Sequence, residues 1–322
     1  MLDRLLIVCW HNVEGTPSSP VADGRGRAGF AEQLELLRRV GNVVALEDGL
    51  RRLAAGTLGP RAIALTFDDG YRDNLEVAAP MLAAHGLPAT VFLVPDFLSG
   101  ARQPWWERLA WALGDARGTH VEWEGRRWAV GHEALHRGTY LELTTALKVL
   151  DQAAREAAVD ELVAQAMPTG RDPSPALMLD WDGARRLADH GIGAGGHASS
   201  HAVLARERPD AQHADLARCR RELTGGLDVD VETLAYPNGR FEDFTPDTVV
   251  AARDAGFRWA ATGVDGWNSA ATPPYELRRI FVRPASGVRG LAWALKRWSR
   301  PRDRLRRAVG RSPTLVYPSP LR

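Results

Sequence analysis

Residues 63–94, IALTFDDGYRDNLEVAAPMLAAHGLPATVFLV, indicate the fold of this chain. Ile63 to Phe67 is a short apolar run that ends at Asp68-Asp69-Gly70, the pattern of a buried strand followed by a turn. Residues 75–85 are predicted to form a helix that a glycine ends, and residues 89–94 a second strand bounded by prolines. A strand, a helix and a strand at this spacing predict a parallel crossover.

The same alternation occurs on both sides of this segment. Further strands are predicted over residues 5–10, 192–195, 231–236, 259–262 and 279–282, and further helices over residues 30–40, 181–190, 210–224 and 247–255. Repeated strand–helix units are typical of an α/β fold with a parallel sheet. We therefore predict a (β/α) barrel of seven or eight strands.

Residues 99–180 interrupt the alternation. A helix is predicted to begin at Trp105, a hairpin to cover residues 121–129, and one long helix to cover residues 144–167. We interpret residues 99–180 as a helical and hairpin insertion in a barrel domain of residues 1–288, followed by a basic tail of residues 289–322.

Composition excludes several classes of protein. Apolar residues make up 45% and charged residues 25% of the 322, as in a globular protein with a large core. Cys9 and Cys219 lie far apart, which excludes a disulfide framework and a thiolate zinc site. No apolar run approaches 18 residues, and the run at residues 1–8 is too short for a signal peptide. We expect a cytoplasmic protein.

Positive charge is concentrated at the C-terminus. Residues 283–322 hold ten arginines and one lysine against one aspartate, a net charge of +10, whereas the whole chain has a net charge of +1. Trp293 and Trp298 give this basic segment an apolar side, which favours peripheral contact with the inner membrane face or an acidic partner. The alternative is a helix that its tryptophans dock on the body. Confinement of the charge to this tail argues against nucleic acid as a partner.

Three predicted strand ends carry groups suited to chemistry, and active sites of barrels form at the carboxyl ends of strands. The first end has the carboxylates of Asp68 and Asp69, the second has His197 and His201, and the third is the turn of residues 236–239, YPNG. Imidazoles four residues apart face the same side if the segment is helical, so both can bind one ion. Each motif alone is common as an ordinary turn or helix surface, and the combination in this order indicates a site.

TFDDG at 66–70, GGHASSH at 195–201 and YPNG at 236–239 together resemble the polysaccharide deacetylase family, also called NodB-like or carbohydrate esterase family four. The resemblance covers most of residues 5–283. It is strongest to the branch that deacetylates poly-N-acetylglucosamine and related exopolysaccharides, in which the N-terminal strand ends in a histidine, as here at His11. It implies a distorted (β/α) barrel, a divalent metal and hydrolysis of N-acetyl groups on sugars.

The resemblance assigns roles by position. Asp69, His197 and His201 match the metal ligands, with Zn²⁺ as the usual ion and Co²⁺ or Ni²⁺ as alternatives. Three protein ligands leave a position for water, whose pKa the ion lowers to about 7 for attack on the acetyl carbonyl. Asp68 matches the general base. We expect each ligating imidazole to donate its other N–H to a carbonyl or carboxylate.

The chain departs from the usual family pattern at two places. No histidine follows His213, so the Leu-x-His motif that supplies the acid is missing, and His11 becomes the candidate acid. Ala235 stands where the third motif has an arginine that orients the catalytic aspartate, and Arg279 is the candidate replacement. The backbone N–H of Asn238 matches the oxyanion donor. Further candidates for substrate binding or orientation are Tyr236, Pro237 and Trp267.

These roles predict a metal-dependent deacetylase that acts on an N-acetylhexosamine-containing polysaccharide or a glycan precursor. Two alternatives remain at this point. One is a metal-dependent amidase or esterase with a small non-carbohydrate substrate. The other is a catalytically silent glycan-binding protein, against which the presence of all four residues Asp68, Asp69, His197 and His201 argues.

Overall fold

The computed structural model describes residues 4–131 and 138–298. Its main feature is a curled sheet in which all neighbouring strands are parallel, in the order β10-β1-β3-β4-β7-β8-β9 with β2 beside β3. The strands are β1 (Leu5–Trp10), β2 (Asn42–Val43), β3 (Ala62–Phe67), β4 (Ala89–Leu93), β7 (Ile192–Gly196), β8 (Thr233–Ala235), β9 (Trp259–Ala261) and β10 (Ile280–Phe281). The predicted distorted (β/α) barrel is confirmed.

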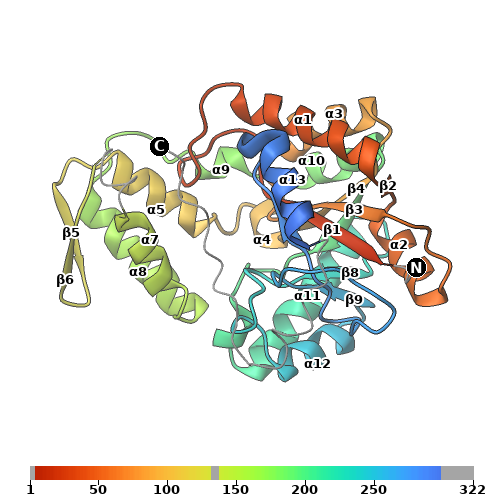
Figure 1. Ribbon diagram of the computed structural model, residues 1–322. Coiled ribbons are helices and arrows are strands. Elements are labelled where there is room, and N and C mark those ends of the chain that lie inside the picture. The colour runs from red at the N-terminus through yellow and green to blue at the C-terminus, as the bar shows by residue number, and fades with distance from the viewer. Residues whose placement is uncertain (1–3, 132–137, 299–322) are drawn as a thin grey trace.

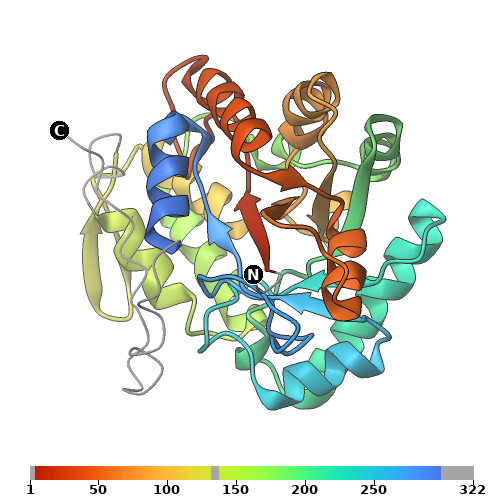
Figure 2. The same ribbon diagram turned by 45° about the vertical axis from the view of Figure 1, so that its right-hand side comes forward.

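Helices surround this sheet, as Figure 1 and the rotated view in Figure 2 show. They are α1 (Arg25–Val40), α2 (Leu46–Ala55), η1 (Asn74–Ala78), α3 (Ala79–Ala84), α4 (Pro95–Leu98), α10 (Trp181–Arg186), η2 (Leu187–His190), η3 (Leu204–Arg206), α11 (Pro209–Leu227), α12 (Pro246–Asp254), η4 (Pro284–Ser286) and α13 (Gly287–Trp298). Their order along the chain matches the predicted alternation, while β2 and α2 were not predicted.

The barrel closes between β9 and β10 through an extended segment rather than a long strand. Ala260 N–H donates to the carbonyl of Pro274 at 2.9 Å, and Leu277 N–H donates to the carbonyl of Ala260 at 2.9 Å. Thr262 N–H donates to the carbonyl of Leu277 at 2.7 Å, and Leu277 lies two residues before Arg279 in the sequence. Residues 274–279 thus lie alongside β9, lead into β10 and bring Arg279 to the barrel interior.

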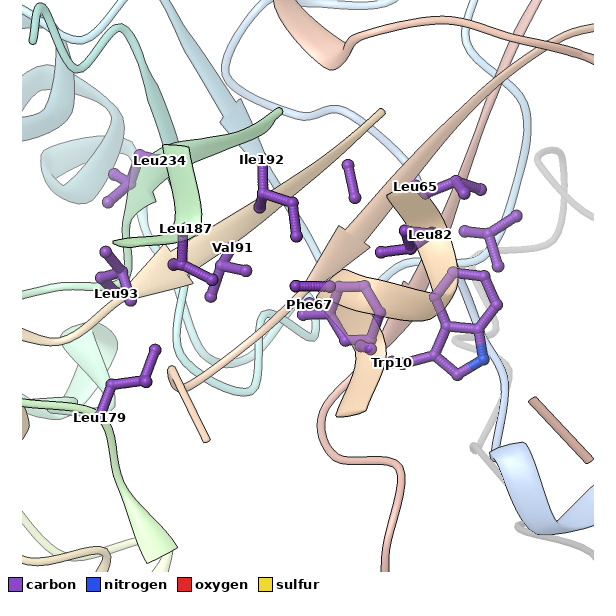
Figure 3. Close-up of a cluster of buried hydrophobic side chains, with 14 of the residues drawn as sticks. Trp10, Leu65, Phe67, Leu82, Val91, Leu93, Leu179, Leu187, Ile192 and Leu234 are labelled. Atoms are coloured by element: carbon purple, nitrogen blue, oxygen red, sulfur yellow. The ribbon is translucent and has the colours of Figure 1, made fainter. Parts of the chain in front are cut away.

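Alternate side chains of each strand enter two separate apolar cores, because successive side chains of a strand point to opposite faces. On β1, Leu5 and Ile7 lie in the inner core, whereas Leu6, Val8 and Trp10 lie in the outer core under the helices. Figure 3 shows part of the outer core, with Trp10 and Phe67 side by side and leucines from several strands and helices around them. Every β1 side chain is buried, which accounts for the continuous apolar run in the sequence.

Helix α2 covers the end of the barrel where the strands begin. Its buried side chains Leu46, Leu50 and Leu53 pack in the same core as Leu5 and Ala62, the first residues of β1 and β3. The opposite end, where the strands finish, is therefore the open one.

Residues between α4 and α10 form the interruption predicted from the sequence. They comprise α5 (Trp105–Gly114), the antiparallel hairpin of β5 (His120–Trp123) and β6 (Arg126–Ala129), α7 (Thr139–Leu147), α8 (Gln152–Ala166) and α9 (Ser174–Leu177). Helices α5, α7 and α8 and the hairpin share an apolar core of their own and lie to one side of the barrel in Figure 1, away from α2, whereas Leu177 of α9 packs against a separate cluster that includes Tyr71 and Phe97. We propose that this segment is an insertion, and the domain boundaries at 288 and 289 stay a prediction.

The single long helix predicted over residues 144–167 is wrong. The chain forms α7 and α8 instead, and Asp151 ends the continuity because its side chain accepts a hydrogen bond from the N–H of Ala154 as the N-cap of α8. The apolar spacing continued across the break, so periodicity alone did not reveal it.

The C-terminal helix α13 packs along α1, with Leu291 buried, while most of the basic tail, residues 299–322, lies outside the described residues. Its predicted contact with a membrane or an acidic partner stays a prediction. Within the described ranges, none of the helices has both the length and the apolar character needed to cross a membrane.

Strand β7 is expected to tolerate a methyl group at one glycine and not at another. A Cβ on Gly195 would lie 2.5 Å from a ring carbon of Phe92, whereas a Cβ on Gly193 would make an ordinary contact of 3.5 Å with Thr90. Gly195→Ala should lower the free energy of unfolding by about 1–3 kcal/mol through overpacking. Gly193→Ala is the matched control and should change it by less than about 0.5 kcal/mol in urea denaturation. Equal stability of the two variants would contradict the close packing of β7 on Phe92.

Candidate active site

The three strand-end motifs converge at the open end of the barrel. Nε2 of His197 lies 3.3 Å and Nε2 of His201 lies 3.2 Å from the same carboxylate oxygen, Oδ1 of Asp69. One donor atom from each of these three buried residues lies within 4.8 Å of the others. Residues 128 or more positions apart in the sequence therefore form one cluster.

Strand alternation explains how the inner groups reach this place. Ala62 and Ala64 of β3 face the inner core, so Asp68 continues the inward-facing series one step beyond the strand. On β1, Leu5 and Ile7 face inward, and His11 continues their series. On β7, Ile192 faces the outer core. His197 lies five residues later, so strand alternation turns it to the inner side. Each strand thus ends with a polar group on the inner side of the barrel.

The loop that carries His197 and His201 is not helical. The prediction from their spacing of four residues, that both face the same side, had assumed a helix. Residues 197–203 have no regular structure, and Ala198 and His201 adopt positive φ values of 57° and 55°. Asp215 of α11 holds the loop instead, because its carboxylate accepts hydrogen bonds from the N–H of Ser199 at 2.6 Å and from the hydroxyl of Ser200. The two imidazoles converge because of these turns rather than through helical periodicity.

The hydrogen bonds of His197 define its tautomer. Its Nδ1 lies 2.7 Å from the carbonyl oxygen of Ala235, an acceptor, so Nδ1 carries a proton. Burial would lower the pKa of His197, but the charge of Asp68 and the contact with Asp69 raise it, so without an ion Nε2 shares a proton with Asp69. A bound cation would take the place of that proton. The expected second bond is absent for His201, whose buried Nδ1 has no partner among the described residues.

The donor set fits a divalent metal. One carboxylate oxygen and two imidazole nitrogens are ligands of catalytic zinc sites, and ligand atoms about 2.0–2.1 Å from a tetrahedral ion are about 3.3–3.4 Å apart. The two nitrogen–oxygen distances in the cluster, 3.3 and 3.2 Å, agree with that spacing. Burial lowers the pKa of His201 to about 4, which keeps this imidazole neutral and able to bind a cation at neutral pH. Burial would raise the pKa of Asp69, but its bonds to both histidines hold the pKa well below the usual range.

Asp68 is paired with Arg279, the residue suggested as the replacement for the missing motif arginine. Nη1 and Nη2 of Arg279 donate to the two carboxylate oxygens at 2.6 and 2.8 Å, and both side chains are almost fully buried. Burial would raise the pKa of Asp68, but the charges of Arg279 and His197 outweigh it and hold that pKa below its ordinary value. Asp68 therefore stays a carboxylate inside the barrel.

His11 lies exposed at the rim of the same end of the barrel. Its ring packs against Phe281 of β10, with 5.6 Å between the ring centroids, and its charge when protonated lowers the pKa of both Asp68 and Asp69. The imidazole thus lies within electrostatic range of the two carboxylates and is exposed to solvent.

Asn238 has the left-handed conformation, with φ at 57°, in the turn after β8. Gly239 follows with φ at 68° and packs against the backbone of Gly263, where a Cβ would lie 2.5 Å from the Gly263 nitrogen. The N–H of Asn238 has no acceptor among the described residues, so it is available as a donor.

Three other predicted residues have contacts outside the cluster. Tyr236 and Pro237 are buried, and the Tyr236 ring stacks on Phe244 with 4.9 Å between centroids. Trp267 precedes Asn268, whose N–H donates to the carbonyl of Leu5 at 2.9 Å, at the end of the barrel where β1 begins. The structure therefore places Trp267 at the opposite end of β1 from His11.

Two aromatic residues that sequence reasoning did not assign to the metal cluster cover His201. Phe97 of α4 stacks on its ring with 5.8 Å between centroids, and Trp106 of α5 lies 4.6 Å from it. The Trp106 Nε1–H donates to the hydroxyl of Tyr71, which in turn donates to the buried carboxylate of Glu107. From the sequence, Trp106 is a candidate either for stacking against a sugar ring or for anchoring the insertion to the barrel, whereas Phe97 carried no signal.

The fold and this cluster define a (β/α)-barrel protein with a carboxylate–imidazole centre at the carboxyl ends of its strands. The model of the family described as polysaccharide deacetylase matches residues 55–260, and the chain belongs to that family. YxkH of Bacillus subtilis (strain 168), a relative assigned to the polysaccharide deacetylases, is 21% identical over 233 residues, which are 72% of this chain and 55% of YxkH. The chain thus spans about half the length of that relative.

Solved structures of similar fold extend this comparison. The deacetylase PplD of Streptococcus pyogenes, in complex with acetate, superposes with a TM-score of 0.60 at 17% identity, covering 91% of this chain and 99% of PplD. IcaB from Ammonifex degensii gives 0.56 at 21% identity over 91% and 97% of the two chains. The BpsB deacetylase domain from Bordetella bronchiseptica gives 0.54 at 16% over 86% and 95%. At these identities the likeness establishes the fold.

The cluster predicts that a divalent metal stabilises the folded protein. Zn²⁺ at about 100 times its dissociation constant should add about 2.7 kcal/mol to the free energy of unfolding and raise Tm by several degrees. Asp69→Asn should lose most of this increase, whereas the exposed control His213→Ala should keep it, in thermal unfolding with and without EDTA. An equal increase in all three proteins would mean that the ion binds elsewhere.

The buried pair of Asp68 and Arg279 predicts a pH-dependent loss of stability. Because the pKa of Asp68 is lower in the folded than in the unfolded chain, the pair stabilises the protein above the ordinary pKa of 3.8 and loses this effect as pH falls. Arg279→Met should cost about 3–5 kcal/mol at pH 7 by leaving a buried carboxylate unpaired. The cost should shrink toward pH 4 as Asp68 takes up a proton, in urea denaturation. A cost that is constant with pH, or equal to that of the exposed control Arg253→Met, would contradict this pairing.

Proposed function

We propose that this protein hydrolyses N-acetyl groups of N-acetylhexosamine units in a polysaccharide or a glycan precursor. The observation that carries the proposal is an ionised, buried carboxylate, Asp68, beside the donor cluster of Asp69, His197 and His201 at the open end of the barrel. Family membership supports the reaction class.

The three cluster residues would hold a divalent metal, for which we propose Zn²⁺. When bound, such an ion lowers the pKa of water and polarises a carbonyl oxygen. The neutral state of His201 and the Nδ1 proton of His197 both leave Nε2 free to act as a ligand atom.

Asp68 would act as the general base that takes a proton from the attacking water. Its two oxygens each accept one bond from Arg279, and a carboxylate oxygen has a second lone pair for a further proton. The same guanidinium, held by the carbonyl of Thr262 at 2.9 Å, fixes the plane of the carboxylate. The base is thus oriented before a substrate arrives.

His11 would supply the proton that the leaving amine needs. An amide nitrogen leaves poorly until it is protonated, so an acid is required on the leaving-group side. His11 lies at the rim and is exposed, which gives a polymer access to it. The free N–H of Asn238 would donate to the developing oxyanion, a contribution of about 3 kcal/mol for one such donor.

An exopolysaccharide is the substrate class we propose. The fold likeness to IcaB and to the BpsB deacetylase domain, together with a histidine that ends β1, supports this choice. Docking of the basic tail at an anionic surface or acidic partner is part of the same proposal and would bring the enzyme close to membrane-bound glycan precursors.

Asp68→Asn tests the reaction. The variant should lose at least about a hundredfold of acetate release from N-acetylated glycans, because general base catalysis contributes about 10²–10⁴-fold, while its metal content stays that of the unchanged protein. Metal analysis and an acetate assay on a panel of acetylated oligosaccharides and small amides measure both. Asp182→Asn, at an exposed aspartate of α10, is the control. Unchanged turnover in Asp68→Asn would refute the base, and turnover of small amides alone would favour the amidase alternative.

A further inference from the structure

The segment that follows β1 and carries His11 is held by two adjacent side chains of another strand–turn–helix unit. One carboxylate oxygen of Asp73, Oδ2, accepts hydrogen bonds from the N–H of Val13 at 2.7 Å and of Glu14 at 2.8 Å. The side-chain amide of Asn74 donates to the carbonyl oxygen of His11 at 2.8 Å. Three bonds thus fix the backbone on both sides of residue 12.

The imidazole of His11 has little else to hold it. Among the described residues its only ring contact is with Phe281, and its nitrogens make no hydrogen bond within that part of the chain. An exposed side chain placed by one ring contact takes its position mainly from its backbone. The backbone bonds to Asp73 and Asn74 therefore decide where the imidazole stands.

Asp73 and Asn74 lie close in the sequence to the metal cluster and are packed against the turn that carries Asp69. Asp73 lies four residues after Asp69, and Asn74 begins η1, where its N–H donates to the carbonyl of Tyr71 at 3.0 Å. Asn74 is fully buried. The turn that follows β3 therefore carries both Asp69, a residue of the metal cluster, and the side chains of Asp73 and Asn74 that bond the backbone around His11.

Asp73 is suited to this task as a carboxylate. Burial raises its pKa to about 6 against the opposing effect of the two backbone bonds, so it is ionised at neutral pH. Hydrogen bonds from N–H groups to a carboxylate are shorter and about twice as strong as those between neutral groups. The next stretch, residues 15–24, is held elsewhere, because the buried carboxylate of Glu107 accepts hydrogen bonds from the N–H and the hydroxyl of Ser18 at 2.9 and 2.7 Å.

We propose that Asp73 and Asn74 are positioning residues that set the distance between the proton donor His11 and the metal cluster. The proposal rests on the proposed function, in which His11 protonates the leaving amine. It goes beyond that function by naming the groups that align the acid with the rest of the site.

The test compares two substrates that differ in their need for an acid. An N-acetylated hexosamine oligomer has an amine leaving group that must be protonated, whereas the aryl oxide of 4-nitrophenyl acetate leaves without a proton. Asp73→Ala should lower kcat for the glycan by about tenfold to a hundredfold, since a displacement near 1 Å can cost about a hundredfold. It should change aryl acetate turnover by less than about threefold and leave metal content unchanged, because Asp68 and the cluster stay in place.

Matched variants separate positioning from general damage. Asp73→Asn keeps an oxygen that accepts both N–H groups and should recover most of the glycan activity, whereas Asp73→Glu displaces the acceptor and should not. Asp115→Ala removes a carboxylate that accepts two backbone N–H groups, from Thr169 and Gly170 in the insertion, and should leave both activities unchanged. If Asp73→Ala does not fold, the Asn and Glu variants carry the comparison.

His11→Asn distinguishes failure of this proposal from failure of the proposed function. It should show the same selective loss on the glycan as Asp73→Ala. Full glycan turnover by His11→Asn would overturn the acid assignment and the positioning proposal with it. A selective loss in His11→Asn, with normal glycan turnover in Asp73→Ala and Asp73→Glu, would overturn the positioning proposal alone. Equal losses on both substrates in the Asp73 variants would also overturn it, since they would show a structural role.

Discussion

The ion pair of Asp68 and Arg279 joins the parts of the barrel on which the site depends. Arg279 enters the interior just before β10, donates to Asp68 at the end of β3 and to the carbonyl of Thr262 after β9, and lies over the ring of Phe92 from β4 at 5.5 Å. Two unit charges in a medium of low dielectric are costly unless they are paired in good geometry. The bidentate contact meets that condition, so the closure of the barrel and the ionisation of Asp68 depend on the same bond.

Backbone strain is concentrated around this pair. Eight non-glycine residues of the described chain have positive φ, and four of them, Asp69, Ala198, His201 and Asn238, lie in the three strand-end motifs. Such conformations cost about 1–3 kcal/mol each and persist where the surroundings hold them in place. Here the holding groups are identifiable: the carboxylate of Asp215 bonds the histidine loop, and Gly239 packs against Gly263 under Asn238. The site is thus preorganised at a cost that the packed barrel offsets.

The sequence predicted most strands and the positions of Asp68, Asp69, His197 and His201 just after them, because both depend on local signals. Buried strands such as β1 and β3 appear as apolar runs, and the residues just after them share one edge of a parallel sheet. Prediction from the sequence failed where a side-chain hydrogen bond between distant segments determines the conformation of a loop. Nothing local indicates that Asp73 reaches Val13 or that Asp215 holds the histidine loop. The break between α7 and α8 is different, because its N-cap Asp151 is a local signal that was passed over when only the apolar spacing was considered. Likewise, the helical interpretation of His197 and His201 followed from their spacing, whereas turns determine the actual loop.

The two departures from the usual family pattern are connected in space. At position 235 the motif arginine is replaced by Ala235, whose small side chain lies in the inner core and whose carbonyl orients His197. An arginine there would add a second guanidinium to an interior that Arg279 already occupies, without a second carboxylate to pair with it. The proposed acid, His11, follows β1, which pairs with β10, the strand that follows Arg279. The orienting cation Arg279 and the proposed proton donor His11 thus lie next to the same pair of neighbouring strands.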